Sequence, residues 1–222
     1  MHMPNFELMI KKAVRQLRQA GVFRFTRDVI KRSLQHLPDD DFDKINGTDT
    51  AGSISLWRFK IPYPSAQYGV TYGSVPEERI RHALENIPRN TTLVDLGCGK
   101  GRALIVAARM GFRKIIGVEF VGELVAIALK NLAITGAEAQ VILADAGEYM
   151  LPGGPLCIYL YNPFSLEIMR KVAAQLLGRK EDIWVVYLNP YCEPGCSELF
   201  DAILHRVVDM AGLIVWCSMN RS

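Results

Sequence analysis

From Thr91 onward, two hydrophobic patterns alternate along the chain. Short, continuously apolar runs rich in β-branched residues predict strands at residues 92–96, 114–119, 139–144, 156–161 and 183–189. Between them, apolar positions recur every three or four residues and predict helices at 102–110, 122–134 and 165–177. Buried strands that alternate with helices are typical of a parallel sheet covered on both faces. Two last runs, 205–209 and 213–218, lie too close for a crossover helix and predict an antiparallel hairpin.

The first 37 residues show helical spacing in two stretches and are strongly basic, with eight Lys and Arg residues against two acidic ones. We expect residues 1–37 to form a basic helical arm packed on the domain edge. The alternative is that the arm contacts an acidic partner or a membrane surface.

Pro38 and the acidic run Asp39–Asp43 are expected to end the second helix. Residues 44–75 are rich in Gly, Pro, Ser, Thr and Tyr and follow no sustained period. Because long ordered loops are usually functional, we expect residues 38–75 to be a connector that covers the site. Pro76 then opens a helix to about Ile87, and residues 76–222 form the main domain.

Composition points to an ordinary globular chain of 222 residues, with 50% hydrophobic residues and a net charge of only +3. The five cysteines are an odd number and favour reduced thiols, hence a cytoplasmic location. No signal peptide and no apolar run long enough to span a membrane is found. Cys192, Cys196 and His205 fit no common zinc spacing, so no metal site is predicted.

The stretch "LVDLGCGKGRAL", residues 93–104, places Gly97, Gly99 and Gly101 directly after the first strand of the predicted sheet. Ligands of such sheets bind beyond the carboxyl ends of the strands, and glycine leaves room for a ligand against the backbone. The pattern favours an extended, nucleoside-bearing cofactor. The alternative is that the glycines only form a tight turn.

Two acidic residues end the next strands. Glu119 follows the glycines by about 20 residues, where a carboxylate accepts hydrogen bonds from ribose hydroxyls. Asp145 could accept a hydrogen bond from an adenine amine while the Ala146 amide donates to the ring. Alternatively, Glu119 is a solvated strand end and Asp145 a helix N-cap.

Asp95 discriminates between cofactors. The glycines follow GxGxG spacing instead of the GxGxxG of dinucleotide sites, and Asp95 lies two residues before the first of them. An acid there would repel a pyrophosphate but suits an ammonium group. The combination favours a zwitterionic amino-acid tail joined to adenosine, which describes S-adenosylmethionine. A nicotinamide dehydrogenase is the second interpretation.

The motifs "VDLGCGKGRAL", "IIGVEF", "VILADA" and "YLYNPF" resemble, in order and spacing, the class I S-adenosylmethionine-dependent methyltransferases over about residues 68–222. The resemblance implies a Rossmann-like α/β fold whose seven-stranded sheet has order 3-2-1-4-5-7-6 with the last strand antiparallel. It also implies a role for each of several residues. Asp95 and the Gly97 carbonyl would hold the amino end, Glu119 the ribose, and Asp145 with Ala146 the adenine, with Phe120 also among the cofactor-binding residues.

The upstream segment "YGVTYGSVPEERI" is similar to the segment before the first motif in non-SET histone-lysine methyltransferases and their bacterial and mitochondrial lysine-methylating relatives. In that family a tyrosine and a following hydroxyl residue close over the methionine tail. The resemblance assigns these roles to Tyr72 and Ser74.

Asn162, Pro163 and Phe164 follow the fourth strand and are the predicted catalytic residues. Carbonyls of Asn162 and of the Pro163 region could aim an amine lone pair at the methyl, and Phe164 could stack on a base or face a lysine. The alternative is an Asn-Pro turn. Because the motif has one proline, unlike the [DN]PP[YF] of nucleic-acid amino-methylating enzymes, we expect an N-methyltransferase with protein lysine favoured over nucleic acid and small molecules. A cofactor-binding module without catalysis is a further alternative.

Overall fold

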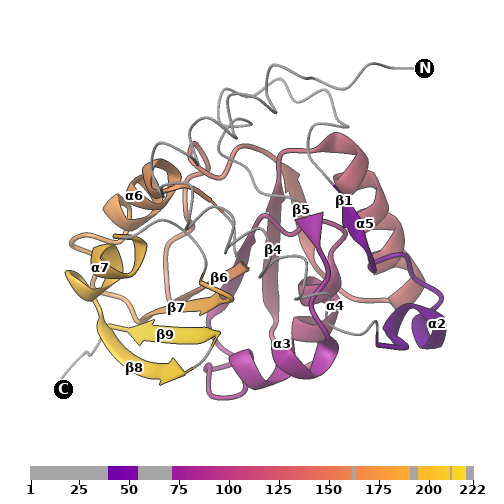
Figure 1. Ribbon diagram of the computed structural model, residues 1–222, viewed down its shortest axis with the longest axis horizontal. Helices are drawn as coiled ribbons and strands as arrows, with labels where there is room; N and C mark the ends of the chain where they lie inside the picture. The colour runs from indigo at the N-terminus through magenta and orange to yellow at the C-terminus, as the bar shows by residue number, and fades with distance from the viewer. Residues whose placement is uncertain (1–39, 55–71, 162–163, 191–194, 211, 219–222) are drawn as a thin grey trace, which may run out of the picture.

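The strands expected after residue 91 form one mixed sheet in the computed structural model, which describes residues 40–54, 72–161, 164–190, 195–210 and 212–218 (Figure 1). Its seven strands lie in the order β5-β4-β3-β6-β7-β9-β8. The strands are β3 (Thr92–Leu96), β4 (Lys114–Glu119), β5 (Gln140–Leu143), β6 (Leu156–Tyr161), β7 (Ile183–Leu188), β8 (His205–Met210) and β9 (Leu213–Cys217). Neighbours pair in parallel from β5 to β7, and β9 is antiparallel to both β7 and β8. The predicted strand order is therefore confirmed.

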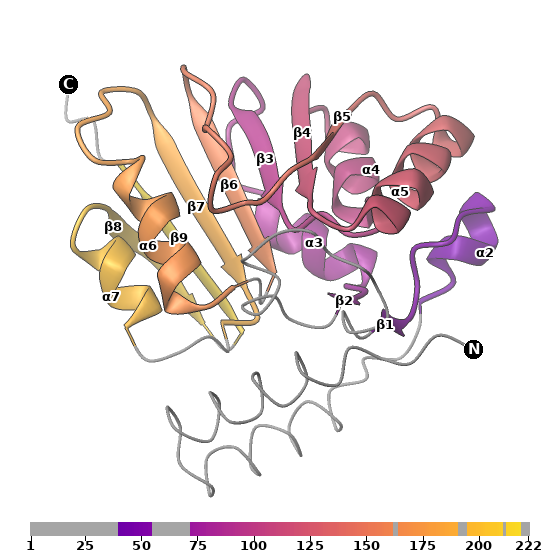
Figure 2. The ribbon, with the colours of Figure 1, turned by 90° about the horizontal axis from the view of Figure 1, so that it is seen from above.

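Helices cover the sheet on both faces, as Figure 2 shows. The described helices are α2 (Phe42–Asn46), α3 (Glu77–Leu84), α4 (Arg102–Arg109), α5 (Gly122–Thr135), α6 (Leu166–Ala174) and α7 (Cys196–Asp201). All but α2 lie against the sheet, whereas α2 lies farther out, next to α5. One buried cluster joins α3 and α4 to one face of the sheet, and a second joins α6 and α7 to the other. Every residue of β3 is buried because both of its faces are covered.

The segment before α3 is more structured than the sequence suggested. Phe42 begins the short helix α2 inside the acidic run, and Gly47 ends it with a left-handed φ of 68°. Two-residue strands β1 (Ser53–Ile54) and β2 (Tyr72–Gly73) then pair antiparallel. These elements, like α7, are too short to show a hydrophobic period, which is why the sequence pattern missed them.

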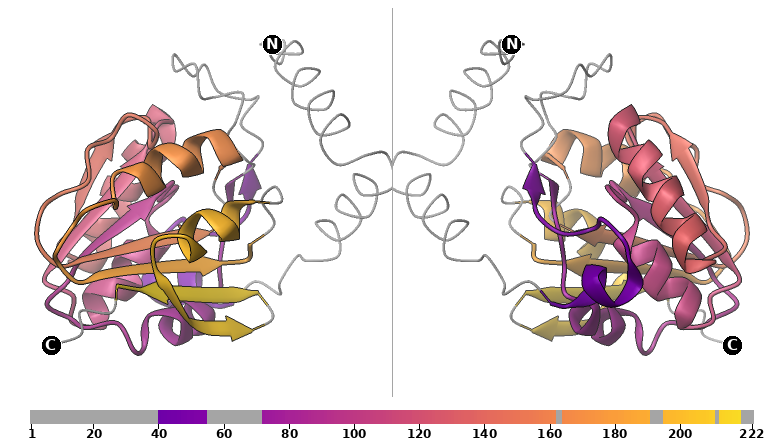
Figure 3. Two further views of the ribbon diagram at one scale, coloured as in Figure 1. Left: turned by 90° about the vertical axis from the view of Figure 1, so that its left-hand side faces the viewer. Right: turned by 90° about the vertical axis from the view of Figure 1, so that its right-hand side faces the viewer.

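The ends of the predicted elements shift by a few residues. Helix α3 ends at Leu84 instead of Ile87, and the Ile87 amide closes a turn onto the Leu84 carbonyl before Pro88. Figure 3 shows, in its right-hand view, α2 on the outside of the molecule on the side of α5. The predicted basic arm, residues 1–37, lies outside the described residues. Among the helices that are described, none is long and apolar enough to cross a bilayer.

Candidate functional site

The glycine turn joins β3 to α4 at the carboxyl edge of the sheet. Gly97, Gly99 and Gly101 have φ of 83°, 54° and 84°, in the region that glycine favours. A Cβ at Gly99 would lie 2.2 Å from the Tyr72 ring, and one at Gly97 would lie 3.5 Å from the Phe164 ring. Gly101 instead faces α5, where a Cβ at this glycine would lie 3.2 Å from the Cβ of Ala128. Aromatic rings thus approach the first two glycines, while the third permits helix packing.

A hollow opens beside the turn, between the ends of β3, β4 and β5. Its walls combine backbone, two acidic side chains and apolar surface. They are formed by Gly97, Val118, Glu119, Phe120, Ala144, Asp145, Ala146, Phe164 and Ile168. The structure therefore brings together six of the predicted site residues, from four separate segments of the chain.

Glu119 is buried at the end of β4 and ties two turns together. One carboxylate oxygen accepts from the Gly99 amide at 3.0 Å, and the other accepts from the amides of Phe120 and Val121, each at 2.9 Å. Burial raises the pKa of Glu119, and these three hydrogen bonds oppose that rise. The carboxylate thereby fixes the glycine turn against the start of α5 while it lines the hollow.

Asp95 is the second buried acid, with 4% of its surface exposed. Burial, together with the nearby Glu119 carboxylate, raises the pKa of Asp95 to about 8. No lysine or arginine among the described residues offsets the charge of either carboxylate. Two buried acids without a cation leave a site that favours a positively charged ligand.

Asp145 and Ala146 follow β5 on the opposite wall. The Asp145 carboxylate accepts from the Gly147 amide at 2.8 Å, which holds the loop in a tight turn. Phe164 lines the same hollow as these two residues. This location puts the Phe164 ring beside the predicted adenine-binding residues, a contact that its predicted acceptor role did not include.

Tyr72 lies on the other side of the glycine turn. Its hydroxyl donates to the Thr50 carbonyl at 2.5 Å, and its ring covers Gly99. The Ser74 amide donates to the Gly52 carbonyl at 3.2 Å, which continues the pairing of β1 with β2. Figure 2 shows β1 and β2 at the edge where β3 and β6 end. The described ends of the predicted covering segment, residues 40–54 and 72–75, therefore meet next to the glycine turn.

Residues 93–178 match a family model described as a methyltransferase domain. The chain carries a class I S-adenosylmethionine-dependent methyltransferase domain. S-adenosylmethionine is accordingly the cofactor of this domain.

Relatives of the methyltransferase domain include two that act on proteins by name. The ribosomal protein L11 methyltransferase of Geobacter sulfurreducens is 31% identical over 91 residues, 40% of this chain and 29% of the relative. The protein-lysine N-methyltransferase of Saccharolobus islandicus is 37% identical over 74 residues, 32% of this chain and 46% of the relative. The chain thus spans less than half the length of either relative.

The fold is also similar to that of a solved RNA methyltransferase from Salinibacter ruber, in complex with S-adenosyl-L-homocysteine. The two share 23% identity and a TM-score of 0.51, over 65% of this chain and 92% of that one. This likeness shows that the methyltransferase domain has the common fold of the class.

The residues of the hollow fit an adenosine that carries a cationic tail. The glycine turn offers bare backbone. Glu119 lines the hollow and Asp95 lies buried in β3 just before the turn, and no described cation offsets either acid. The remaining walls are apolar or aromatic, as a nucleoside base requires. The charge and the lining of this site therefore fit S-adenosylmethionine.

Some predicted residues of the methyltransferase domain are outside the part that the structure describes. Asn162 and Pro163, which follow β6 directly, are two of them, so their predicted catalytic roles remain predictions. Cys192 is likewise outside it. Within the described ranges, no group of three or more His, Cys, Asp or Glu side chains could hold a metal ion.

The residues behind the glycine turn were not predicted from the sequence. Lys100 and Arg102 are buried and bond to residues 40–51. A signal was present, because two cations beside glycines in an otherwise apolar stretch require acidic partners when they are buried. The sequence alone did not indicate that the acidic run after Pro38 supplies some of those partners.

Proposed function

We propose that this chain is an S-adenosylmethionine-dependent N-methyltransferase whose acceptor is a protein lysine. The observation that carries the cofactor half of the proposal is the pair of buried carboxylates, Asp95 and Glu119, beside a glycine turn. A sulfonium nucleoside with an ammonium group supplies the positive charge that this pair lacks.

The acidic and aromatic residues at the glycine turn and the hollow each have a defined task in the proposal. When bound, the cofactor supplies a methyl group on a positively charged sulfur, which is already an activated leaving group. Asp95 binds the ammonium group, Glu119 accepts from the ribose hydroxyls, and Asp145 accepts from the adenine amine. Phe164, which lines the same hollow, packs against the base. Catalysis then rests on alignment, because an in-line approach of the acceptor is what the activated methyl still requires.

The acceptor half of the proposal rests on resemblance. The lysine-methylating relative and the L11 methyltransferase relative both act on proteins by their names. The local similarity of the Tyr72 segment to non-SET lysine methyltransferases points the same way. We propose that the Asn162 and Pro163 carbonyls orient the lysine amine, since a carbonyl that accepts an N–H bond aims the nitrogen lone pair away from itself.

Transfer of a labelled methyl group tests the proposal as a whole. Purified protein is incubated with methyl-labelled S-adenosylmethionine and a cell lysate separated into protein, nucleic-acid and small-molecule fractions. We expect label in protein, at lysine after hydrolysis, and a tenfold or greater loss of transfer in Asn162→Ala with little change in cofactor affinity.

Other outcomes of this experiment are equally informative. Label in nucleic acid or in small molecules would replace lysine with another acceptor and leave the cofactor assignment intact. Calorimetric binding of NAD, with no binding of S-adenosylmethionine or S-adenosylhomocysteine, would refute the methyltransferase assignment itself.

Substitution of Glu119 separates its two tasks. Glu119→Ala removes the acceptor for the amides of Gly99, Phe120 and Val121, so we expect a loss of stability of about 1–3 kcal/mol for each amide left unpaired. Glu119→Gln keeps one acceptor oxygen and should unfold at a higher temperature than the alanine variant. Both should lower cofactor affinity by tenfold or more in calorimetry. Glu138→Ala, which removes an exposed carboxylate from the loop before β5, is the control and should change neither quantity.

A further inference from the structure

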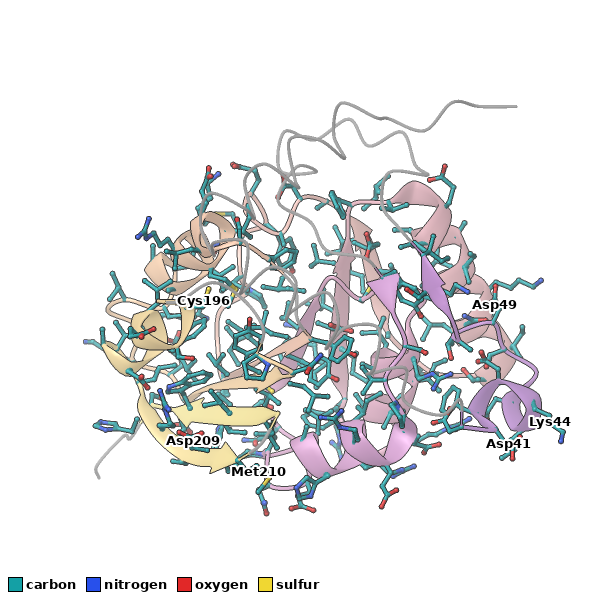
Figure 4. All side chains as sticks on the ribbon, viewed as in Figure 1. Asp41, Lys44, Asp49, Cys196, Asp209 and Met210 are labelled. Carbon is teal, nitrogen blue, oxygen red and sulfur yellow. The ribbon has the colours of Figure 1, made fainter. Side chains whose placement is uncertain are left out.

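Lys100 and Arg102 flank Gly101 at the end of the glycine turn, and both side chains are buried, with 7% and 5% exposed. Lys100 Nζ lies 2.5 Å from Asp49 Oδ1 and donates to the Ala51 carbonyl at 3.0 Å. Figure 4 labels Asp49 on the side of the molecule where α2 lies. A buried cation is costly unless carboxylates and carbonyls surround it, so the glycine turn depends on a segment about fifty residues earlier.

Arg102 joins that segment to the start of α3. Its Nε donates to Thr50 Oγ1 at 2.6 Å, and one terminal nitrogen donates to Asp40 Oδ1 at 2.6 Å and to the Val75 carbonyl at 3.2 Å. The guanidinium also stacks 4.7 Å above the centre of the Phe42 ring. A rigid planar cation with this many partners fixes the relative position of the elements it contacts.

Thr50 is fully buried and is the link between Arg102 and the site. Its hydroxyl accepts from Arg102 and donates to Asp43 Oδ1 at 2.7 Å, and its amide donates to Asp43 Oδ2 at 2.7 Å. Its carbonyl accepts from the Tyr72 hydroxyl at 2.5 Å. One residue therefore connects the buried cation to the ring that covers the glycine turn.

The Tyr72 ring depends on this connection for its place. The ring lies so close to Gly99 that a single methyl group at that glycine would overlap it. Pairing of β2 with β1, through Tyr72 and Ile54, holds the backbone, but the hydroxyl bond to Thr50 anchors the far end of the side chain. Asn131 adds a second brace, since it bonds to the Asp49 amide at 3.0 Å and to the Asp49 carbonyl at 2.9 Å.

We propose that Thr50 and Arg102 are positioning residues for the cofactor: they hold the Tyr72 ring over the glycine turn and thereby increase cofactor affinity. The inference rests on the proposed function. Thr50 and Arg102 do not line the hollow, and neither does Tyr72. The two residues act through the Tyr72 ring because that ring packs on Gly99, in the turn beside the hollow. A purely structural role would lower stability but would leave the affinity of the folded protein unchanged.

A double-mutant cycle on the full chain tests this inference, with S-adenosylhomocysteine as the calorimetric probe. Thr50→Val removes the hydroxyl that contacts Arg102 while keeping the side-chain volume, and Tyr72→Phe removes the bond to the Thr50 carbonyl while keeping the ring. We expect each variant to lower affinity five- to twentyfold. The double variant should lose little more affinity than the single variant with the larger loss, because both changes break the same connection.

Hydrogen exchange gives a readout independent of ligand. In Thr50→Val without probe, the amides of Tyr72 and Gly73 should exchange at least tenfold faster than in the unmodified protein. Thr50→Ser keeps the hydroxyl and should retain both the affinity and the slow exchange. Thr135→Val is the matched control and should change neither quantity. Among the described residues, the Thr135 hydroxyl bonds to two carbonyls of its own helix, Asn131 and Leu132.

Four results would overturn the inference. Additive losses in the cycle would show that Thr50 and Tyr72 act separately. Unchanged affinity in Tyr72→Phe would do so even if Thr50→Val failed to fold. Failure of the unmodified protein to bind S-adenosylhomocysteine would overturn this inference and the proposed function together, whereas binding with unchanged exchange and affinity in the variants would overturn the inference alone.

Discussion

Asp95→Asn should make the protein more stable at pH 8 and at the same time weaken its binding of the cofactor. Burial and Glu119 raise the pKa of Asp95 to about 8, above the value of 3.8 for an unperturbed carboxyl. The folded state therefore holds a proton that the unfolded chain releases between these two values. The free energy of unfolding falls as pH rises through that window, and asparagine, which does not ionise, removes this fall.

The expected gain at pH 8 is on the order of 2 kcal/mol or more, measured by guanidinium unfolding at pH 5 and pH 8. Cofactor affinity should drop by at least about thirtyfold, because the ammonium group loses its buried charged partner. In the unmodified protein, affinity should rise by up to tenfold per pH unit between pH 6 and 8, and in Asp95→Asn it should stay flat. Asp41→Asn, at an exposed residue labelled in Figure 4, is the control. If Asp95→Asn and the unmodified protein were equally stable at pH 8, the raised pKa of Asp95 would be contradicted.

Gly99→Ala should abolish measurable cofactor binding. The φ of 54° costs alanine about 1–2 kcal/mol, and the added methyl would lie 2.2 Å from the Tyr72 ring, which must move. Moving the ring also removes the cover over the methionine end that the family resemblance assigns to Tyr72. We expect an affinity loss of at least a hundredfold in calorimetry and a larger drop in melting temperature than strain alone gives.

Gly136→Ala is a control that separates the backbone strain of a positive φ from the contact of the added methyl with the Tyr72 ring. Gly136 ends α5 with a φ of 64°, and nothing lies within 4 Å of a Cβ placed there. This control should show the strain cost and keep the affinity of the unmodified protein. If Gly99→Ala and Gly136→Ala lost the same stability and both bound the cofactor normally, the Tyr72 ring would not be fixed against the turn.

Most of the sheet was predictable because its strands are covered on both faces. Continuous apolar runs such as Leu156–Tyr161 have no other stable location, and the observed β6 has these same bounds. The lone short elements were not predictable, since α2 and α7 have five and six residues and gain their stability from tertiary contacts. Phe42, for instance, is buried in the core against α4. Its acidic neighbours in the sequence suggest an exposed segment, so this contact was not expected.

The site was predictable to the extent that it consists of strand ends. Glu119 and Asp145 end neighbouring parallel strands, so their side chains must meet at one edge of the sheet. The sequence did not reveal that Glu119 also accepts from the Gly99 amide, because that bond depends on the closed shape of the turn. Nor did it reveal the partners of Arg102, which depend on a contact across more than fifty residues.

The buried cations at the end of the glycine turn determine where a self-sufficient module can begin. The stretch that the family model matches, residues 93–178, contains Lys100 and Arg102 but none of their carboxylate partners. Cut out alone, it would lose these ion pairs together with the segment that buries both cations and the α3 side chains that pack with α4. The recognisable part of the chain is thus smaller than the part that stands by itself. A transplanted or minimised version of this domain has to begin before Asp40.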